Sequence, residues 1–126
     1  MNEPQLPGAR KRLSLAVRTS LLCEFRDRSG VLQAFEVCAD QTTFGGLCSA
    51  LINMPGVVFP DHNPEKWFKR PTRFTFREHL YEVSIPHDNI RVAPVDDTVS
   101  LIEMEEILEY VRHNVLRSRV SRYTVR

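Results

Sequence analysis

Two short stretches of the sequence each place a histidine beside an aspartate, Pro-Asp-His-Asn-Pro at residues 60–64 and Pro-His-Asp-Asn at residues 86–89. Imidazole and carboxylate groups bind zinc or iron, and they also transfer protons. Asp61, His62, His87 and Asp88 would supply such a site if the fold brought both stretches together. However, their spacing matches no metal signature, and Pro, Asp and Asn are turn formers. We interpret both stretches as turns and expect no metal or cofactor, with a metal-dependent enzyme as the remote alternative.

The cysteines offer a second kind of chemistry. Cys23, Cys38 and Cys48 are an odd number with no Cys-x-x-Cys motif, which argues against a disulfide framework. The hydrophobic pattern places Cys23 and Cys48 on buried faces, where thiols are unreactive. The chain also lacks a Gly-x-Ser-x-Gly motif. We therefore expect no catalytic residue.

The third candidate is the basic and aromatic stretch EKWFKRPTRFTFR at residues 65–77. Single-stranded nucleic acids bind to cations and stacking rings, whereas Trp and Arg dominate the energetics of protein interfaces. We expect an aromatic anchor with a charged rim, for which the candidate residues are Trp67, Phe68, Lys69, Arg70, Arg73 and Arg77. A protein partner is the first expectation and nucleic acid the alternative. Four further arginines, Arg117, Arg119, Arg122 and Arg126, would extend the patch if the C-terminus lay nearby.

A β-hairpin is the first element expected to position these residues. Period-two alternation from Leu13 to Phe25 predicts one long strand. Asp27 and Gly30 predict a three-residue loop that pairs Asp27 with Val31. In that register the buried face carries Leu21, Cys23, Phe25, Phe35 and Val37, while Glu24, Arg26 and Glu36 face the other way. Cys23 and Cys38 then lie on opposite faces and cannot pair.

A helix is expected in the stretch that follows the hairpin. Its apolar stripe comprises Phe44, Leu47, Cys48, Leu51 and Ile52. Asp40 or Thr42 would cap its start, and Pro55-Gly56 would end it. The pair Gly45-Gly46 weakens a first helical turn, so we expect close packing against the sheet there.

The second half of the chain predicts a hairpin, a short strand and a helix. The hairpin would turn across Glu78-His79, and the strand would run from Ile90 to Val95. The helix would start near Thr98 or Ser100, where Ser100 and Glu103 fit a capping box. Its stripe comprises Leu101, Met104, Leu108, Val111 and Val115, widened by Ile107 and Leu116. Acidic residues in its first half and basic residues in its second half would oppose the helix dipole.

These elements predict a two-layer α+β fold. The sheet would be mixed or antiparallel, in the order hairpin–helix–hairpin–strand, with a long C-terminal helix on it. The same order is found in β-grasp folds, although no motif supports descent from that family. We expect a flexible tail at residues 1–10, a single domain at residues 11–120 and a basic tail at residues 121–126.

Composition narrows the class of protein. The chain has 42% hydrophobic and 26% charged residues with a net charge of +1, which is typical of a soluble globular domain without a strong overall field. It has no apolar window long enough to span a membrane and no secretory signal, so we expect a cytoplasmic protein with no membrane partner. An excess of Arg over Lys agrees with a GC-rich bacterial genome. We interpret the chain as a small non-enzymatic binding or adaptor module, with a homodimer through the last helix as a further option.

Overall fold

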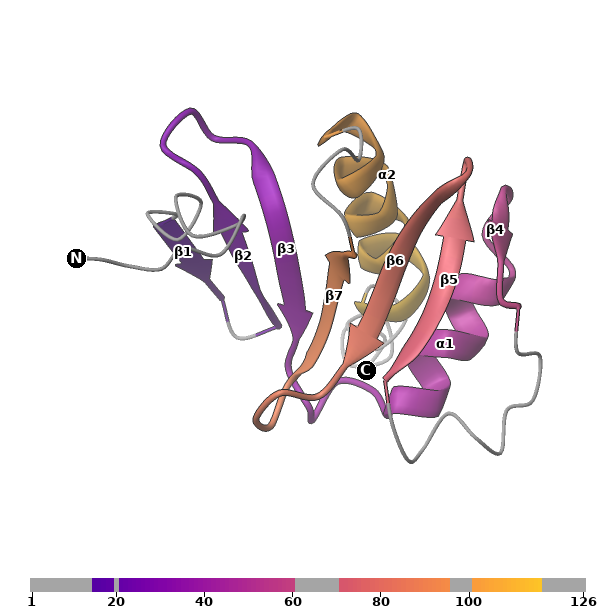
Figure 1. Ribbon diagram of the computed structural model, residues 1–126. Coiled ribbons are helices and arrows are strands. Elements are labelled where there is room, and N and C mark those ends of the chain that lie inside the picture. The colour runs from indigo at the N-terminus through magenta and orange to yellow at the C-terminus, as the bar shows by residue number, and fades with distance from the viewer. Residues whose placement is uncertain (1–14, 20, 61–70, 96–100, 117–126) are drawn as a thin grey trace.

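The computed structural model describes residues 15–19, 21–60, 71–95 and 101–116. In these residues the chain forms one antiparallel sheet of seven strands with two α-helices (Figure 1). The strands are β1 (Leu15–Arg18), β2 (Leu22–Arg26), β3 (Leu32–Val37), β4 (Val57–Val58), β5 (Thr72–Phe76), β6 (His79–Ser84) and β7 (Ile90–Pro94). Their order in the sheet is β1-β2-β3-β7-β6-β5-β4. The predicted α+β class is therefore confirmed, with the antiparallel form of the sheet.

The helices are α1 (Phe44–Ile52) and α2 (Leu101–Val111), and a π-helical segment, Arg112–Leu116, follows α2. In Figure 1 both α-helices lie behind the sheet. We call the opposite face, which is turned toward the viewer, the outer face. The predicted two-layer order, the long C-terminal helix and the β-grasp-like order remain predictions. Both expected tails, and Ser100 with its capping box, lie outside the described residues.

The expected long first strand is wrong, because the chain turns back at Thr19 between β1 and β2. The Thr19 N–H donates to the Leu22 carbonyl oxygen at 2.8 Å. The Thr19 hydroxyl accepts from the backbone N–H groups of Leu21 and Leu22, both at 3.1 Å. A threonine that bonds the backbone ahead of it forms a tight turn. The apolar alternation runs through this turn, so alternation alone did not reveal it.

The predicted register between β2 and β3 is also wrong, although its loop is right. The Asp27 N–H donates to the Val31 carbonyl oxygen at 2.9 Å, as the three-residue loop requires. A β-bulge between Phe25 and Arg26 then shifts the pairing by one residue, so that Cys23 pairs with Glu36. Because side chains alternate with period two, this shift reverses every face assignment along β2.

The bulge therefore changes which residues share a face. Leu22 takes the core position, while Cys23 and Phe25 lie on the outer face rather than beside Phe35. The Cys38 N–H donates to the Leu21 carbonyl oxygen at 3.0 Å, which continues the shifted register. Cys38 thus shares the outer face with Cys23, contrary to the prediction, and both are free thiols.

Helix α1 buries the predicted stripe except for Ile52, which is partly buried, and it begins differently from the prediction. Its N-cap is Thr43, whose side chain accepts from the Gly46 N–H at 2.9 Å, and not Asp40 or Thr42. A Cβ atom at position 46 would lie 2.7 Å from the Thr42 hydroxyl oxygen and 3.1 Å from that of Thr43. Gly46 is therefore required by the threonine side chains before the helix, and not by the expected contact with the sheet.

The turn between β5 and β6 lies one residue earlier than predicted. Phe76 pairs with His79, so the two turn residues are Arg77 and Glu78. Both have left-handed backbone conformations, with φ of +52° and +73°. Two consecutive positive φ angles define a type I′ turn, whose twist suits a hairpin but which usually contains Asn and Gly.

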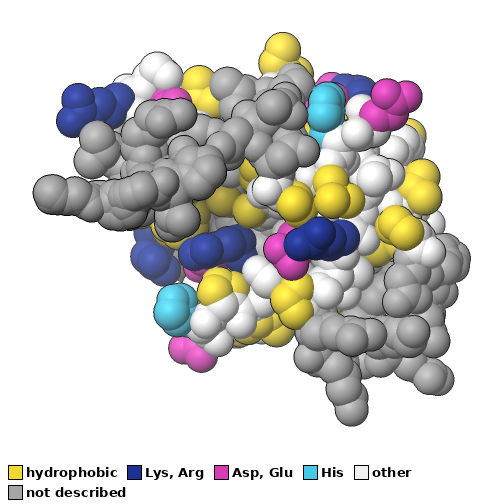
Figure 2. All heavy atoms as spheres, viewed as in Figure 1, with side chains coloured by type: hydrophobic (Ala, Val, Ile, Leu, Met, Phe, Trp, Pro, Cys, Tyr) yellow, Lys and Arg dark blue, Asp and Glu magenta, His cyan; other side chains and the backbone are white. Residues whose placement is uncertain are grey.

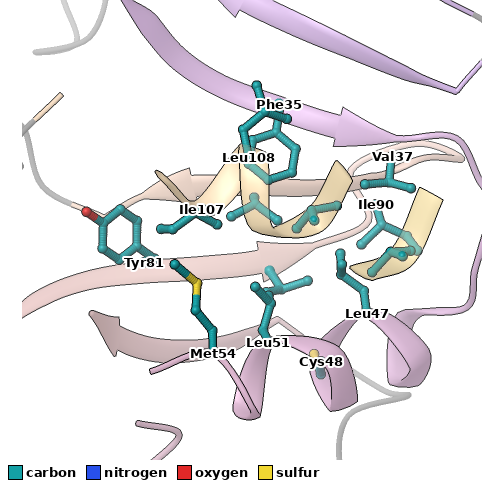
Figure 3. Close-up of a cluster of buried hydrophobic side chains, with 14 of the residues drawn as sticks. Phe35, Val37, Leu47, Cys48, Leu51, Met54, Tyr81, Ile90, Ile107 and Leu108 are labelled. Atoms are coloured by element: carbon teal, nitrogen blue, oxygen red, sulfur yellow. The ribbon is translucent and has the colours of Figure 1, made fainter. Parts of the chain in front are cut away.

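The core lies between the sheet and the two helices (Figure 3). Leu47 and Leu51 of α1 meet Ile107 and Leu108 of α2 in one buried cluster with the side chains of Phe35, Val37 and Ile90. The described part of the predicted last-helix stripe is buried here, namely Met104, Ile107, Leu108, Val111, Val115 and Leu116. Since these side chains pack inside their own domain, they offer no free area to a second copy of the chain.

Candidate functional site

The structure describes only part of the predicted binding site. Trp67, Phe68, Lys69 and Arg70 lie outside the described residues, as do the C-terminal arginines at 117, 119, 122 and 126. Arg73 lies on β5 and Arg77 lies in the β5–β6 turn. Strand β5 ends at Phe76, and the two arginines have different surroundings.

Arg77 is bound by its own domain on the helix side. Its guanidinium forms an ion pair with Glu106 of α2 and lies 4.6 Å from the centroid of the Phe76 ring. Arg73, by contrast, lies on the outer face, where its Nε is 3.8 Å from a carboxylate oxygen of Glu82. Its side chain is 55% exposed. The Arg77 side chain is similarly exposed, at 54%, so the two arginines differ in the face on which they lie, and Arg73 is the one on the outer face.

An apolar row crosses the outer face beside Arg73. Val58 of β4 pairs with Thr75 of β5, and Thr75 pairs with Leu80 of β6. The Val95 N–H donates to the Leu80 carbonyl oxygen at 2.9 Å and so continues the row beyond the end of β7. Val58 is 58% exposed and Val95 is 37% exposed, while Thr75 and Leu80 are half-buried. We call Val58, Thr75, Leu80 and Val95 the outer row.

The residues next to the outer row carry balanced charges. Arg73 pairs across the strands with Glu82, and Glu82 pairs with Ala93. Farther along, Arg91 donates to one oxygen of Glu36 through Nε at 2.9 Å and Nη2 at 2.7 Å. Figure 2 shows the outer face, on which hydrophobic side chains lie with Lys or Arg and Asp or Glu groups between them. Around the outer row this face therefore combines apolar side chains with ion pairs and is not a cationic track.

Ion pairing is general among the arginines in the described part of the chain. Arg18 and Arg28 aside, each of them forms an ion pair with a carboxylate: Arg26, Arg73, Arg77, Arg91 and Arg112. A paired cation has less free charge to offer to a phosphate backbone, which is bound mainly through Lys and Arg charges.

Only one of the two predicted His/Asp pairs lies within the described residues. His87 and Asp88 are both exposed in the loop between β6 and β7, while Asp61 and His62 lie outside the described residues. Within the described ranges, no group of three or more His, Cys, Asp or Glu side chains is placed to hold a metal ion. Whether residues 60–64 and 86–89 lie close together is therefore outside what the structure describes.

The cysteines differ in their surroundings. Cys48 is fully buried in the core, and burial raises the pKa of its thiol to about 12. Cys23 is fully buried on the other side of the sheet, where burial raises its pKa and the charge of Arg18 opposes that effect. Cys38 is half-buried. Burial and the raised pKa therefore make the Cys48 thiol unreactive, as predicted from the sequence.

A buried polar cluster on the helix side was missed by the sequence reasoning. Glu103 of α2 is 7% exposed, and its Oε1 accepts from the Tyr81 hydroxyl at 2.8 Å. The same oxygen lies 2.8 Å from Nδ1 of His79. Burial, followed by the Glu103 carboxylate, raises the pKa of Tyr81. The carboxylate orients the imidazole ring, as an acid–base site requires. Only the alternation of His79 and Tyr81 on β6 signals this cluster in the sequence.

A second missed cluster holds α2 at its other side. Glu24, predicted to face solvent, is 8% exposed on the helix face because of the register shift. Arg26 donates to it through Nε at 2.8 Å, and Arg112 forms an ion pair with it. Arg26 also donates to Glu105 of α2 at 2.5 Å. The buried carboxylate thus has cationic partners from both the strand and the helical segment.

These features define a class of protein, namely an α+β domain with helices on one face of an antiparallel sheet and an accessible apolar row on the other. Comparisons of the chain with protein-family models, with curated proteins and with solved structures found no match. In the described part of the chain, no helix has the length and apolar character needed to cross a membrane.

Proposed function

We propose that this chain is a small non-enzymatic binding module whose outer face contacts another protein. The observation that carries the proposal is the outer row, which has Val58, 58% exposed, at one end and Val95, 37% exposed, at the other, with half-buried Thr75 and Leu80 between them. Contiguous exposed apolar side chains with a polar rim are typical of protein interaction sites. The described residues that support this role are Val58, Leu80, Val95 and Arg73.

The surroundings of the outer row support a protein partner over nucleic acid because the charges there are balanced. Arg73 has Glu82 as its neighbour, and Arg91 is bound to Glu36. A nucleic-acid site needs uncompensated cations, because its affinity comes largely from the release of counterions. Titration of labelled single-stranded RNA and duplex DNA at about 50 and 200 mM salt checks this alternative, since phosphate contacts weaken steeply over that range. We expect no binding at either salt concentration.

In the proposed mechanism, apolar burial provides the affinity and the rim charges provide orientation. Residues of the outer row would be covered by the partner, while Arg73 and Glu82 would contact charges at its edge. Residues 61–70 join β4 to β5 in the sequence, next to the strands that carry Val58 and Thr75. The proposal therefore keeps the predicted anchors Trp67 and Phe68, with Lys69 and Arg70, because they are close in sequence to the strands that form this surface.

Site-specific photo-crosslinking tests the proposal. A photoreactive phenylalanine analogue is placed at position 58 in one sample and at position 102 in a control sample. Ile102 is 70% exposed but belongs to α2, behind the sheet. We expect covalent capture of a protein in the native cells from position 58 and none from position 102. Equal capture from both positions, or none from position 58, would contradict the proposal.

A further inference from the structure

We infer that the protein partner of the outer face is a second copy of this chain, so that two domains pack outer face against outer face. The inference rests on the proposed function and names its partner. It uses the cross-strand rows around β5 and β6, whose side chains are complementary to themselves under a two-fold rotation.

The symmetry that creates this complementarity is a two-fold axis that runs parallel to the strands. It lies between the two outer faces, above the line midway between β5 and β6. Because the sheet order is β7-β6-β5-β4, this rotation places β5 opposite β6 and β4 opposite β7 of the other copy. Each cross-strand row then faces the same row of the other copy. Such an interface is isologous, and the strands of the two sheets run nearly parallel to one another, as in aligned sheet packing.

In the outer row this arrangement brings apolar groups together. Val58 of one copy faces Val95 of the other, and Thr75 faces Leu80, each contact occurring twice. Val58 and Val95 are the exposed members of the row, and the two between them are already half-buried. A face-to-face dimer would therefore bury the apolar side chains that a single domain leaves accessible to water.

The neighbouring row supplies the charge complementarity. Arg73 and Glu82 are directly paired on β5 and β6, on either side of the proposed axis. The rotation sets Arg73 of each copy opposite Glu82 of the other, so that two ion pairs form between the copies. Within one copy these groups are 3.8 Å apart with the Arg73 side chain 55% exposed, so they can form these contacts without breaking a tight buried pair. One cation and one anion per copy also avoid repulsion between identical surfaces.

The sheet face is the better surface for a second copy than the C-terminal helix. The apolar stripe of α2 is buried against its own sheet, with Met104, Ile107 and Leu108 all 0% exposed. The edge strand β4 has only two residues, Val57 and Val58, and so offers little backbone for strand addition. The outer row is thus the described apolar surface that is both accessible and self-complementary.

Sedimentation velocity of the full chain over a wide concentration range tests the inference. We expect a reversible monomer–dimer equilibrium for the unaltered chain. Arg73→Glu places two acidic groups on each copy, and Glu82→Arg places two basic groups on each copy. Each variant alone should self-associate at least about tenfold more weakly, because like charges then meet across the interface. Ile102→Glu, on the helix side, should leave self-association unchanged.

Mixing the two single variants separates contacts between copies from contacts within one. In the mixture every acidic position on one variant faces a basic position on the other, so a heterodimer should form although neither variant dimerises alone. Within each folded chain the mutated pair stays like-charged, so restored association cannot come from repair inside one copy. Circular dichroism of each variant verifies that it is folded.

The possible outcomes distinguish the inference from the proposed function. A chain that stays monomeric at every concentration, or a variant mixture that stays monomeric, would overturn the second-copy inference. If crosslinking from position 58 then captures a different protein, the binding function stands with another partner. If it captures nothing, both fail.

Discussion

At the residue scale, buried carboxylates distinguish this domain. Glu24, Glu36 and Glu103 are each at most 8% exposed. Burying a carboxylate is costly unless cations or hydrogen-bond donors surround it, and each of these has such partners. Glu103 also accepts a hydrogen bond from the hydroxyl of Tyr81, whose side chain is 0% exposed. Glu24 and Glu103 join the sheet to the helical segments through Arg112 and Tyr81, whereas Glu36 joins β3 to β7 through Arg91.

Tyr81→Phe tests the hydrogen bond in this cluster. Removal of the hydroxyl should lower the free energy of unfolding by about 1.5–3 kcal/mol, the range for a hydrogen bond to a charged group. Urea denaturation monitored by circular dichroism measures the change. In a Glu103→Ala background the same substitution should cost much less, because its acceptor is already gone. An equal cost in both backgrounds would show that the hydroxyl contributes nothing through Glu103.

At the element scale, the turns and the bulge decide how the strands are aligned. The β5–β6 turn holds Arg77 and Glu78 at positive φ, which is unfavourable for residues with a Cβ atom. The ion pair of Arg77 with Glu106 and its stacking on Phe76 help to hold this turn in place. The alignment of β5 with β6 that results is the one that puts Thr75 beside Leu80 in the outer row.

Glu78→Gly should stabilise the domain because glycine adopts positive φ without steric cost. We expect the free energy of unfolding to rise by about 1 kcal/mol, which is the left-handed penalty less the greater flexibility of glycine in the unfolded chain. Thermal and urea denaturation measure the change. Gly30, with φ of +91° and open space around it, is the matched control, and Gly30→Ala should destabilise the domain by a similar amount. A loss of stability in Glu78→Gly would refute this account of the turn.

At the scale of the whole molecule, α2 is held to the sheet along two sides of its core stripe. One side of the helical segment is linked to β2 through Glu24, Arg26 and Arg112. The other side is linked to the β5–β6 hairpin through Glu103 and Glu106. Between them the helix buries Ile107 and Leu108 against β3 and α1. The helix face of the sheet is thus closed by packing and ion pairs together, while the outer row remains accessible.

Thiol labelling measures how often the core of the whole domain opens to the solvent. Cys48 is 0% exposed in the core and its pKa is raised to about 12, so a thiol reagent should modify it only when the domain unfolds. Half-buried Cys38 should react in the folded protein. The logarithm of the labelling rate at Cys48 should rise linearly with urea concentration, with a slope set by the equilibrium m-value. A variant that carries both Cys23→Ser and Cys38→Ser isolates Cys48, and labelling of Cys48 as fast as that of Cys38 would contradict the assignment.

Local sequence patterns predicted the helices and strands better than they predicted the alignment of the strands with one another. The stripe from Phe44 to Leu51, the loop pairing Asp27 with Val31 and the strand from Ile90 were all evident in the sequence. The register of β2 was not, because a bulge adds one residue without leaving a distinctive motif. For the same reason Cys23 was assigned to the wrong face. Of the candidate site, Arg73 was proposed from its basic and aromatic context, whereas the outer row was not foreseen.

By itself, the sequence determined the α+β class, the core-facing stripe of α1 and most of that of α2. Those features follow from periodicity and turn chemistry within a few residues of each position. The tertiary structure decided which distant residues became neighbours, such as Glu103 with Tyr81 and Val58 with Val95 in one row. Cross-strand order and register depend on the packing of the whole sheet against both helices. The surface proposed to bind a partner therefore exists only once all the strands are aligned.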